Sequence, residues 1–164
     1  MPIRAGILTV SDKGARGERE DTSGAAIREM LEGIGAAIER YEVIPDEQSE
    51  IEGHLREWVD VGVVDLIVTT GGTGLGPRDV TPQATLAAID YEVSGLAEAM
   101  RAEGAKHTSK AMLSRAVAGV RGRTLIVNLP GSPRGVRENL AAIIEVLPHA
   151  LALLRGDAGE HGAG

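Results

Sequence analysis

The chain has no cysteine and no phenylalanine, and Tyr41, Trp58 and Tyr91 are its only aromatic residues. The absence of cysteine excludes disulfides, thiolate zinc sites and cysteine nucleophiles. A core without large aromatic side chains must consist of Val, Ile, Leu and Ala, which typically fill parallel sheets covered by helices. Because 43% of the 164 residues are hydrophobic, we expect one globular domain.

The sequence also lacks an apolar run of the roughly 18 residues that a membrane span needs. Residues 1–10 read Met-Pro-Ile-Arg-Ala-Gly-Ile-Leu-Thr-Val, which is typical of a first strand rather than of a signal peptide. An excess of positive charge is missing too, since 17 basic residues face 24 acidic ones. Nucleic-acid binding depends on a basic field and on stacking aromatics. We therefore expect a cytoplasmic protein that binds no membrane and no nucleic acid.

Strand and helix patterns alternate along the chain. Apolar runs predict strands at 3–10, 36–44, 63–68 and 124–128, and helical spacing predicts helices at 23–33, 45–59, 81–89, 94–104 and 136–154. Thr81 is expected to cap its helix with Pro82 at the first helical position, and Pro148 to kink or split the last helix. The charged segment 13–20 reads as a mobile loop.

This alternation predicts a single-domain α/β fold, a three-layer α/β/α sandwich with a mostly parallel sheet, over residues 1–155. Residues 156–164 are glycine-rich and read as a flexible tail. Ligands of such sheets collect at the carboxyl ends of the strands. Four segments follow the predicted strands and should open onto one edge, namely Ser11-Asp12, Pro45-Asp46, Thr70 to Asp79 and Asn128 to Arg134.

The third of these segments belongs to a glycine loop. Residues 69–82 read Thr-Thr-Gly-Gly-Thr-Gly-Leu-Gly-Pro-Arg-Asp-Val-Thr-Pro. Glycines let backbone amides approach a ligand closely and threonine hydroxyls add hydrogen bonds, so the loop suits a phosphorylated or other polar small molecule. It is no Walker A loop, because no lysine follows Gly76, and the spacing of Gly72, Gly74 and Gly76 does not fit a dinucleotide fingerprint.

Five segments together resemble the molybdopterin adenylyltransferase family of molybdenum cofactor biosynthesis proteins. They are Thr70–Gly74 with Arg78–Pro82, Asn128–Pro133, Ile44–Glu47, Leu113–Arg115 and Thr9–Asp12. The resemblance runs over residues 3 to 155 in the family's order. It implies a three-layer α/β fold, a homotrimer, and binding of molybdopterin and ATP. It also implies Mg²⁺-dependent transfer of AMP to the pterin's terminal phosphate with release of pyrophosphate, and a possible partner in molybdenum insertion.

The resemblance assigns roles to residues of the strand-end segments. Asp46 and Asp79 match the family's catalytic aspartates and are expected to hold Mg²⁺ or position the nucleotide. Substrate binding is expected from the first strand end, the glycine loop and the second glycine–proline loop: Ser11, Asp12, Thr70, Gly71, Gly72, Thr73, Gly74, Pro130, Gly131 and Ser132. How pterin and adenylate divide among these loops does not follow from the sequence.

Each of these residues also has a purely structural interpretation. Asp46 precedes a helix and can be its N-cap, Asp12 can close a turn, and the glycine loop can simply connect a strand to a helix. Arg78 either pairs with Asp79 or lies in solvent, and Ser114-Arg115 fits a turn or subunit contact.

Three other functions remain open beside adenylyl transfer. They are a paralogue that binds molybdopterin with little adenylylation, a trimeric scaffold module, and the related domain of nucleotide-recycling hydrolases.

Overall fold

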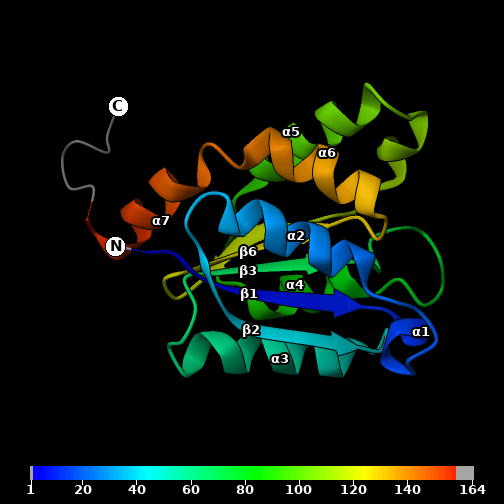
Figure 1. The fold of residues 1–164 in the computed structure, drawn as a ribbon, viewed down its shortest axis with the longest axis horizontal. Helices are drawn as coiled ribbons and strands as arrows, with labels where there is room; N and C mark the ends of the chain where they lie inside the picture. Colours follow the sequence, from blue (N-terminus) through cyan, green and yellow to red (C-terminus); the bar gives the residue numbers. More distant parts are fainter. Residues whose placement is uncertain (1, 158–164) are drawn as a thin grey trace.

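One mixed sheet with helices on both faces organises the chain. The computed structural model describes residues 2–157, so most of the predicted tail lies outside the described residues. The strand order is β2-β1-β3-β6-β5-β4, in which β2, β1, β3 and β6 are parallel and β5 is antiparallel to both of its neighbours. This confirms the predicted α/β fold with a mostly parallel sheet (Figure 1).

The elements follow each other in the alternating order that the apolar periodicity predicts. The strands are β1 Arg4–Val10, β2 Ala37–Ile44, β3 Leu66–Thr70, β4 Tyr91–Glu92, β5 Ala118–Arg121 and β6 Thr124–Leu129. The helices are α1 Asp12–Ala15, α2 Thr22–Glu32, α3 Gln48–Asp60, α4 Thr81–Ala88, α5 Ser94–Ala105, the 3-10 helix η1 Ser109–Leu113, α6 Pro133–Ile143 and α7 Leu147–Arg155.

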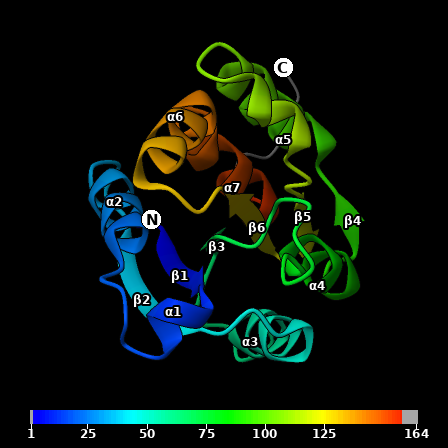
Figure 2. The same ribbon diagram turned by 90° about the vertical axis from the view of Figure 1, so that its right-hand side faces the viewer.

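Two apolar cores lie on the two faces of the sheet, because side chains alternate between the faces along each strand. Ile7 of β1 and Val68 of β3 point into the larger core, which α2, α5, α6 and α7 cover. Leu8 and Ile67, the adjacent residues, point into the smaller core under α3 and α4. Figure 2 shows the two helical layers with the sheet between them.

Several local predictions need correction. The segment after β1 begins with the short helix α1 rather than with a loop, because Ser11 caps it by accepting a bond from the Gly14 amide. Val80, not Thr81, is the N-cap of α4. The sequence patterns do not predict the strands β4 and β5. The predicted split of the last helix at Pro148 is confirmed, because α7 begins at Leu147.

The parallel strands β1, β2, β3 and β6 end at one edge of the sheet, as predicted. The loops that follow them therefore meet there and frame a shared site. None of the helices in the described part of the chain is long and apolar enough to cross a membrane.

Candidate active site

A cavity of about 500 Å³ opens at this edge, between the four strand-end loops and the start of α2. We call it the acidic cavity, because four carboxylates and one arginine line it: Arg19, Glu20, Asp21, Asp46 and Asp79. Eight of the predicted site residues share its wall: Ser11, Asp46, Thr70, Gly71, Gly72, Asp79, Gly131 and Ser132. The structure thus brings together residues that lie up to 121 positions apart in the sequence.

The glycine loop enters this wall in a backbone conformation that only glycine adopts readily. Gly71 and Gly72 have φ angles of +97° and +70°. A Cβ atom on Gly71 would lie 2.3 Å from the Val10 carbonyl oxygen, and one on Gly72 would lie 2.5 Å from Thr81 Oγ1. Thr81 is the first residue of α4 rather than its cap, and its hydroxyl donates to the Gly71 carbonyl at 3.0 Å. The loop is therefore tightly packed from both sides.

Asp46 is not a helix cap, since α3 is capped at Glu47 without any side-chain bond. Instead, Asp46 and Asp12 bond each other reciprocally. The Asp12 amide donates to Asp46 Oδ2 and the Asp46 amide to Asp12 Oδ1, both at 2.9 Å. Burial raises the pKa of Asp46, and the negative charges of Asp12 and Asp79 raise it further. Asp46 is thus a fixed carboxylate in an environment that disfavours its negative charge.

Asp79 is fixed by the glycine loop itself. The Gly76 amide donates to Asp79 Oδ2 at 2.9 Å, and the Asp79 amide donates to the Gly76 carbonyl at 3.0 Å. A Cβ atom on Gly74 would lie 3.0 Å from the same carboxylate oxygen, so a side chain there would press on Asp79. This second carboxylate is therefore held by the backbone that carries it.

Asp12 lines neither this cavity nor the second one described below. Arg78 donates to both of its carboxylate oxygens at 3.1 Å and also to Glu47 at 2.9 Å. The bonds from Arg78 lower the pKa of Asp12, with the Asp46 amide as the second cause. Arg78 thus pairs with Asp12 and Glu47, not with Asp79. The structure places Asp12 behind Asp46, as its support.

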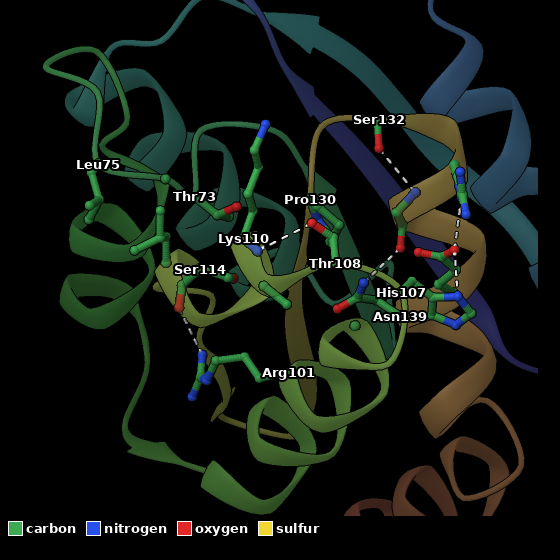
Figure 3. Close-up of a pocket in the computed structure, with 17 residues that line it drawn as sticks. Thr73, Leu75, Arg101, His107, Thr108, Lys110, Ser114, Pro130, Ser132 and Asn139 are labelled. Atoms are coloured by element: carbon green, nitrogen blue, oxygen red, sulfur yellow. Dashed lines mark hydrogen bonds and ion pairs between the residues drawn. The ribbon is translucent and has the colours of Figure 1, made fainter.

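A second cavity, of about 460 Å³, lies on the other side of the glycine loop and of the loop after β6 (Figure 3). Thr73, Gly74 and Pro130 line only this cavity, and Ser132 lines both. We call it the basic cavity, because Arg101 of α5, Lys110 of η1 and Arg134 of α6 line it against one carboxylate, Glu138, and His107, in the turn between α5 and η1, lines it too. The predicted substrate residues are therefore divided between two cavities of opposite charge.

Hydroxyl groups hold the loop after β6 in place between the cavities. Thr70 Oγ1 donates to the Pro130 carbonyl at 2.6 Å, and Ser23 Oγ donates to the Gly131 carbonyl at 2.7 Å. Ser132 accepts a bond from the Gly135 amide and caps α6. The hydroxyl proton of Thr70 is thus committed to the protein.

Sequence reasoning missed Asp21, which lines the acidic cavity. Its Oδ1 accepts from the Gly24 amide at 2.9 Å and caps α2, and its Oδ2 accepts from Thr9 Oγ1 at 2.6 Å and from the Tyr41 hydroxyl. Burial and the bond to Asp21 raise the pKa of Tyr41. The helix start Asp-Thr-Ser-Gly after a charged loop was the available signal for Asp21. No comparable sequence signal indicates that η1 lines the basic cavity.

The two catalytic candidates can be tested as magnesium ligands. Within residues 2–157, Oδ1 of Asp46 and Oδ1 of Asp79 accept no hydrogen bond, so each carboxylate keeps one uncommitted oxygen. The described residues contain no group of three or more His, Asp or Glu arranged to hold a metal ion. Mg²⁺ typically takes one or two carboxylates and fills its other positions with water and substrate phosphates. The pair therefore fits a substrate-bound Mg²⁺.

Comparison with known proteins gives matches over almost the whole chain. Residues 6–149 match the family described as "Probable molybdopterin binding domain". A molybdopterin adenylyltransferase of Helicobacter pylori (strain J99) is 41% identical over 157 residues, covering 94% of this chain and 89% of the relative. The molybdopterin adenylyltransferase of Escherichia coli (strain K12) is 37% identical, with coverages of 94% and 86%.

A solved structure gives a further match. The molybdopterin biosynthesis enzyme MoaB from Thermus thermophilus is 60% identical, with a TM-score of 0.89, and the match covers 94% of this chain and 97% of that one.

Proposed function

Because this chain belongs to the MogA/MoaB family of molybdopterin-binding proteins of molybdenum cofactor biosynthesis, we propose that it is a molybdopterin adenylyltransferase. In this reaction an oxygen of the pterin's terminal phosphate attacks the α-phosphorus of ATP. A new P–O bond forms, the bond between the α- and β-phosphates breaks, and pyrophosphate leaves.

One observation carries the proposal: two fixed carboxylates, Asp46 and Asp79, face the same cavity as the glycine loop. Adenylyl transfer brings two anionic phosphates together, so the site must align them and offset their repulsion. The Gly71 and Gly76 amides already donate to Leu129 and Asp79, whereas within residues 2–157 the Gly72 amide donates to no protein group and is available for a phosphate. The two carboxylates alone would repel a phosphate. Their place in the cavity is explained if they hold a cation that the phosphates share.

Asp46 and Asp79 are the residues that would hold Mg²⁺, through their uncommitted Oδ1 atoms. The ion would supply neutralisation of charge on the reacting phosphates. Asp12 keeps Asp46 in place through the two reciprocal bonds, and Gly76 keeps Asp79 in place through its amide. Neither aspartate needs to accept a proton in this reaction, because phosphates are already largely ionised near neutral pH.

A second candidate function is molybdopterin binding with little adenylylation. The 60% identity to a protein named MoaB favours it, because that name differs from the adenylyltransferase names of the curated relatives. The two functions share the pterin and differ in the turnover of ATP. A homotrimer, a cytoplasmic location and a partner in molybdenum insertion stay predictions.

The decisive experiment incubates the protein with molybdopterin, ATP and Mg²⁺ and measures adenylylated pterin and pyrophosphate. We expect both products in equal amounts, and no product from the Asp79→Asn protein. Asp90→Asn is the matched control, because Asp90 lines neither cavity and this variant should therefore keep full activity. Pterin binding without ATP turnover by the unaltered protein would select the second candidate.

A further inference from the structure

Arg115 follows the 3-10 helix η1 and bonds almost exclusively to the glycine loop. Its amide donates to the Thr73 carbonyl at 2.9 Å, its Nε to the Gly74 carbonyl at 2.9 Å, and its Nη2 to the Asp79 carbonyl at 2.7 Å. One residue thus holds three carbonyl groups of the same loop. Its remaining nitrogen, Nη1, donates to Gln83 Oε1 at 3.2 Å on helix α4.

The loop needs such an external hold, because its own bonds are few. Between Thr73 and Asp79, the backbone–backbone bond within the loop runs from the Asp79 amide to the Gly76 carbonyl. Gly74 and Gly76 give this stretch a wide choice of backbone conformations. The planar guanidinium group of an arginine presents several N–H donors in a fixed arrangement, so it can set the spacing of two carbonyls at once.

We propose that Arg115 is a positioning residue for Asp79 in the transfer reaction. The inference rests on the proposed function for its catalytic consequence. Arg115 bonds the carbonyl of Asp79 and not its carboxylate, so it acts through the backbone of the loop. Holding Gly74 and Asp79 at fixed separation keeps the Asp79 side chain directed at the acidic cavity, with its Oδ2 on the Gly76 amide.

The same residue joins the two cavities. Leu113 and Ser114, the two residues before Arg115, line the basic cavity, while Asp79 lines the acidic one. The turn that ends η1 therefore shapes both walls. This gives the motif Leu113-Ser114-Arg115 a role beyond that of a simple turn.

The test compares Arg115→Ala and Arg115→Lys with Arg121→Ala as a matched control. Arg121 also bonds a backbone carbonyl, that of Ala88 at 2.9 Å, and unlike Arg115 it pairs with a carboxylate, Asp60. It lies at the opposite edge of the sheet and lines neither of the two cavities. Lysine keeps the charge but lacks the planar fork, so it can hold at most part of the loop.

Two measurements are made on each protein. Hydrogen–deuterium exchange reports on the amides of Gly76 and Asp79, which are bonded within the loop. Steady-state kinetics of pterin adenylylation gives kcat and the KM of the pterin. We expect Arg115→Ala to speed loop exchange about tenfold or more and to lower kcat about 100-fold, with a much smaller change in KM.

We expect Arg115→Lys to give intermediate values in both measurements and Arg121→Ala to match the unaltered protein. Unchanged kcat in Arg115→Ala overturns the inference, as does a loss of kcat without faster loop exchange. An equal loss in Arg121→Ala also overturns it, because the effect would then be general destabilisation. If the unaltered protein forms no product, the proposed function fails, and the exchange data alone decide whether Arg115 holds the loop.

Discussion

Replacing Gly72 by alanine tests how tightly the glycine loop is packed against the candidate active site. The φ angle of Gly72 is +70°, and an added Cβ would lie 2.5 Å from Thr81 Oγ1 and 3.2 Å from Asp46 Oδ1. The substitution therefore combines a backbone conformation unfavourable to alanine with a collision at two functional side chains. Gly35→Ala is the matched control, because Gly35 has a φ of +83° and no atom within 4 Å of its Cβ position.

The two contributions can be estimated separately. The positive φ angle costs an alanine about 1 kcal/mol in either variant. In Gly72→Ala, the buried Thr81 hydroxyl must also move and lose its bond to the Gly71 carbonyl, which adds about 2 kcal/mol. We therefore expect a loss of unfolding free energy of about 3 kcal/mol for Gly72→Ala and about 1 kcal/mol for Gly35→Ala.

Urea unfolding measures these losses, and the adenylylation assay measures their consequence for turnover. We expect kcat of Gly72→Ala to fall about 100-fold, because the added methyl group also presses on Asp46 Oδ1, 3.2 Å away. Gly35→Ala should keep its kcat, since it lines neither cavity. Equal stability losses in the two variants, or an unaltered kcat in Gly72→Ala, would refute the reasoning.

Three further predictions concern charged groups. Burial alone raises the pKa of Asp65, but bonds from Arg4 and Arg155 overcome this and lower it to about 2. Because the folded-state pKa is lowered, the ionised carboxylate stabilises the fold above its ordinary pKa near 4, and this stabilisation fades as the pH falls toward 2. Urea unfolding at a series of pH values should therefore show Asp65→Asn about 2 kcal/mol less stable than the unaltered protein at pH 7. This difference in stability should close between pH 4 and pH 2. Arg78→Ala removes two exposed ion pairs, to Asp12 and Glu47, so it should leave the urea midpoint nearly unchanged. It should lower kcat about tenfold by releasing Asp12 from its support of Asp46, and an unchanged kcat would contradict that role. Burial raises the pKa of Asp46, so ionisation of this carboxylate destabilises the folded state as the pH rises. In Asp46→Asn the amide oxygen still accepts from the Asp12 amide, so this variant should unfold at a higher temperature in calorimetry at pH 7 while losing turnover. A lower melting temperature would contradict this.

The sequence was sufficient to predict the parallel half of the fold. β1, β3 and β6 are apolar runs buried on both faces, and each is followed by a turn signal. The strands β4 and β5 escaped prediction because they are only two and four residues long. Segments so short show no periodicity. Their formation depends on pairing, of β5 with β6 and of β4 with β5, which the local sequence does not encode.

The sequence predicts eight residues that line the acidic cavity, but not how they are arranged in it. Position at strand ends is enough to bring Asp46, Asp79 and Gly131 to one cavity. It does not say which carboxylates face the cavity and which stand behind it, as Asp12 does. That distinction depends on the pairing of Asp12 with Arg78, which lies 66 positions away.

Asn128 shows the same limit in the second signature. This residue is fully buried, and its side chain bonds Thr69, Thr85 and the Val117 amide, each at 3.0 Å. A polar residue within a signature suggests ligand binding when read from sequence. Here the buried amide satisfies its bonding groups inside the protein and fixes the ends of β3 and β6 beside each other. The signature therefore combines scaffold residues with cavity residues.

The opposite charges of the two cavities follow from the chemistry of the proposed reaction. A protein with net charge −7 cannot attract anionic substrates through its overall field, so recognition must be local. In the basic cavity, Arg101, Lys110 and Arg134 provide positive charge, and Arg134 is paired with Glu138. In the acidic cavity, the backbone of the glycine loop and Arg19 face four carboxylates, which add repulsion unless a divalent cation is shared with the substrate. Burial raises the pKa of Asp46 most, and the negative charges of Asp12 and Asp79 raise it further, so a cation at this position would relieve their repulsion. An anionic substrate and a cation should therefore bind to the acidic cavity together, each strengthening the binding of the other.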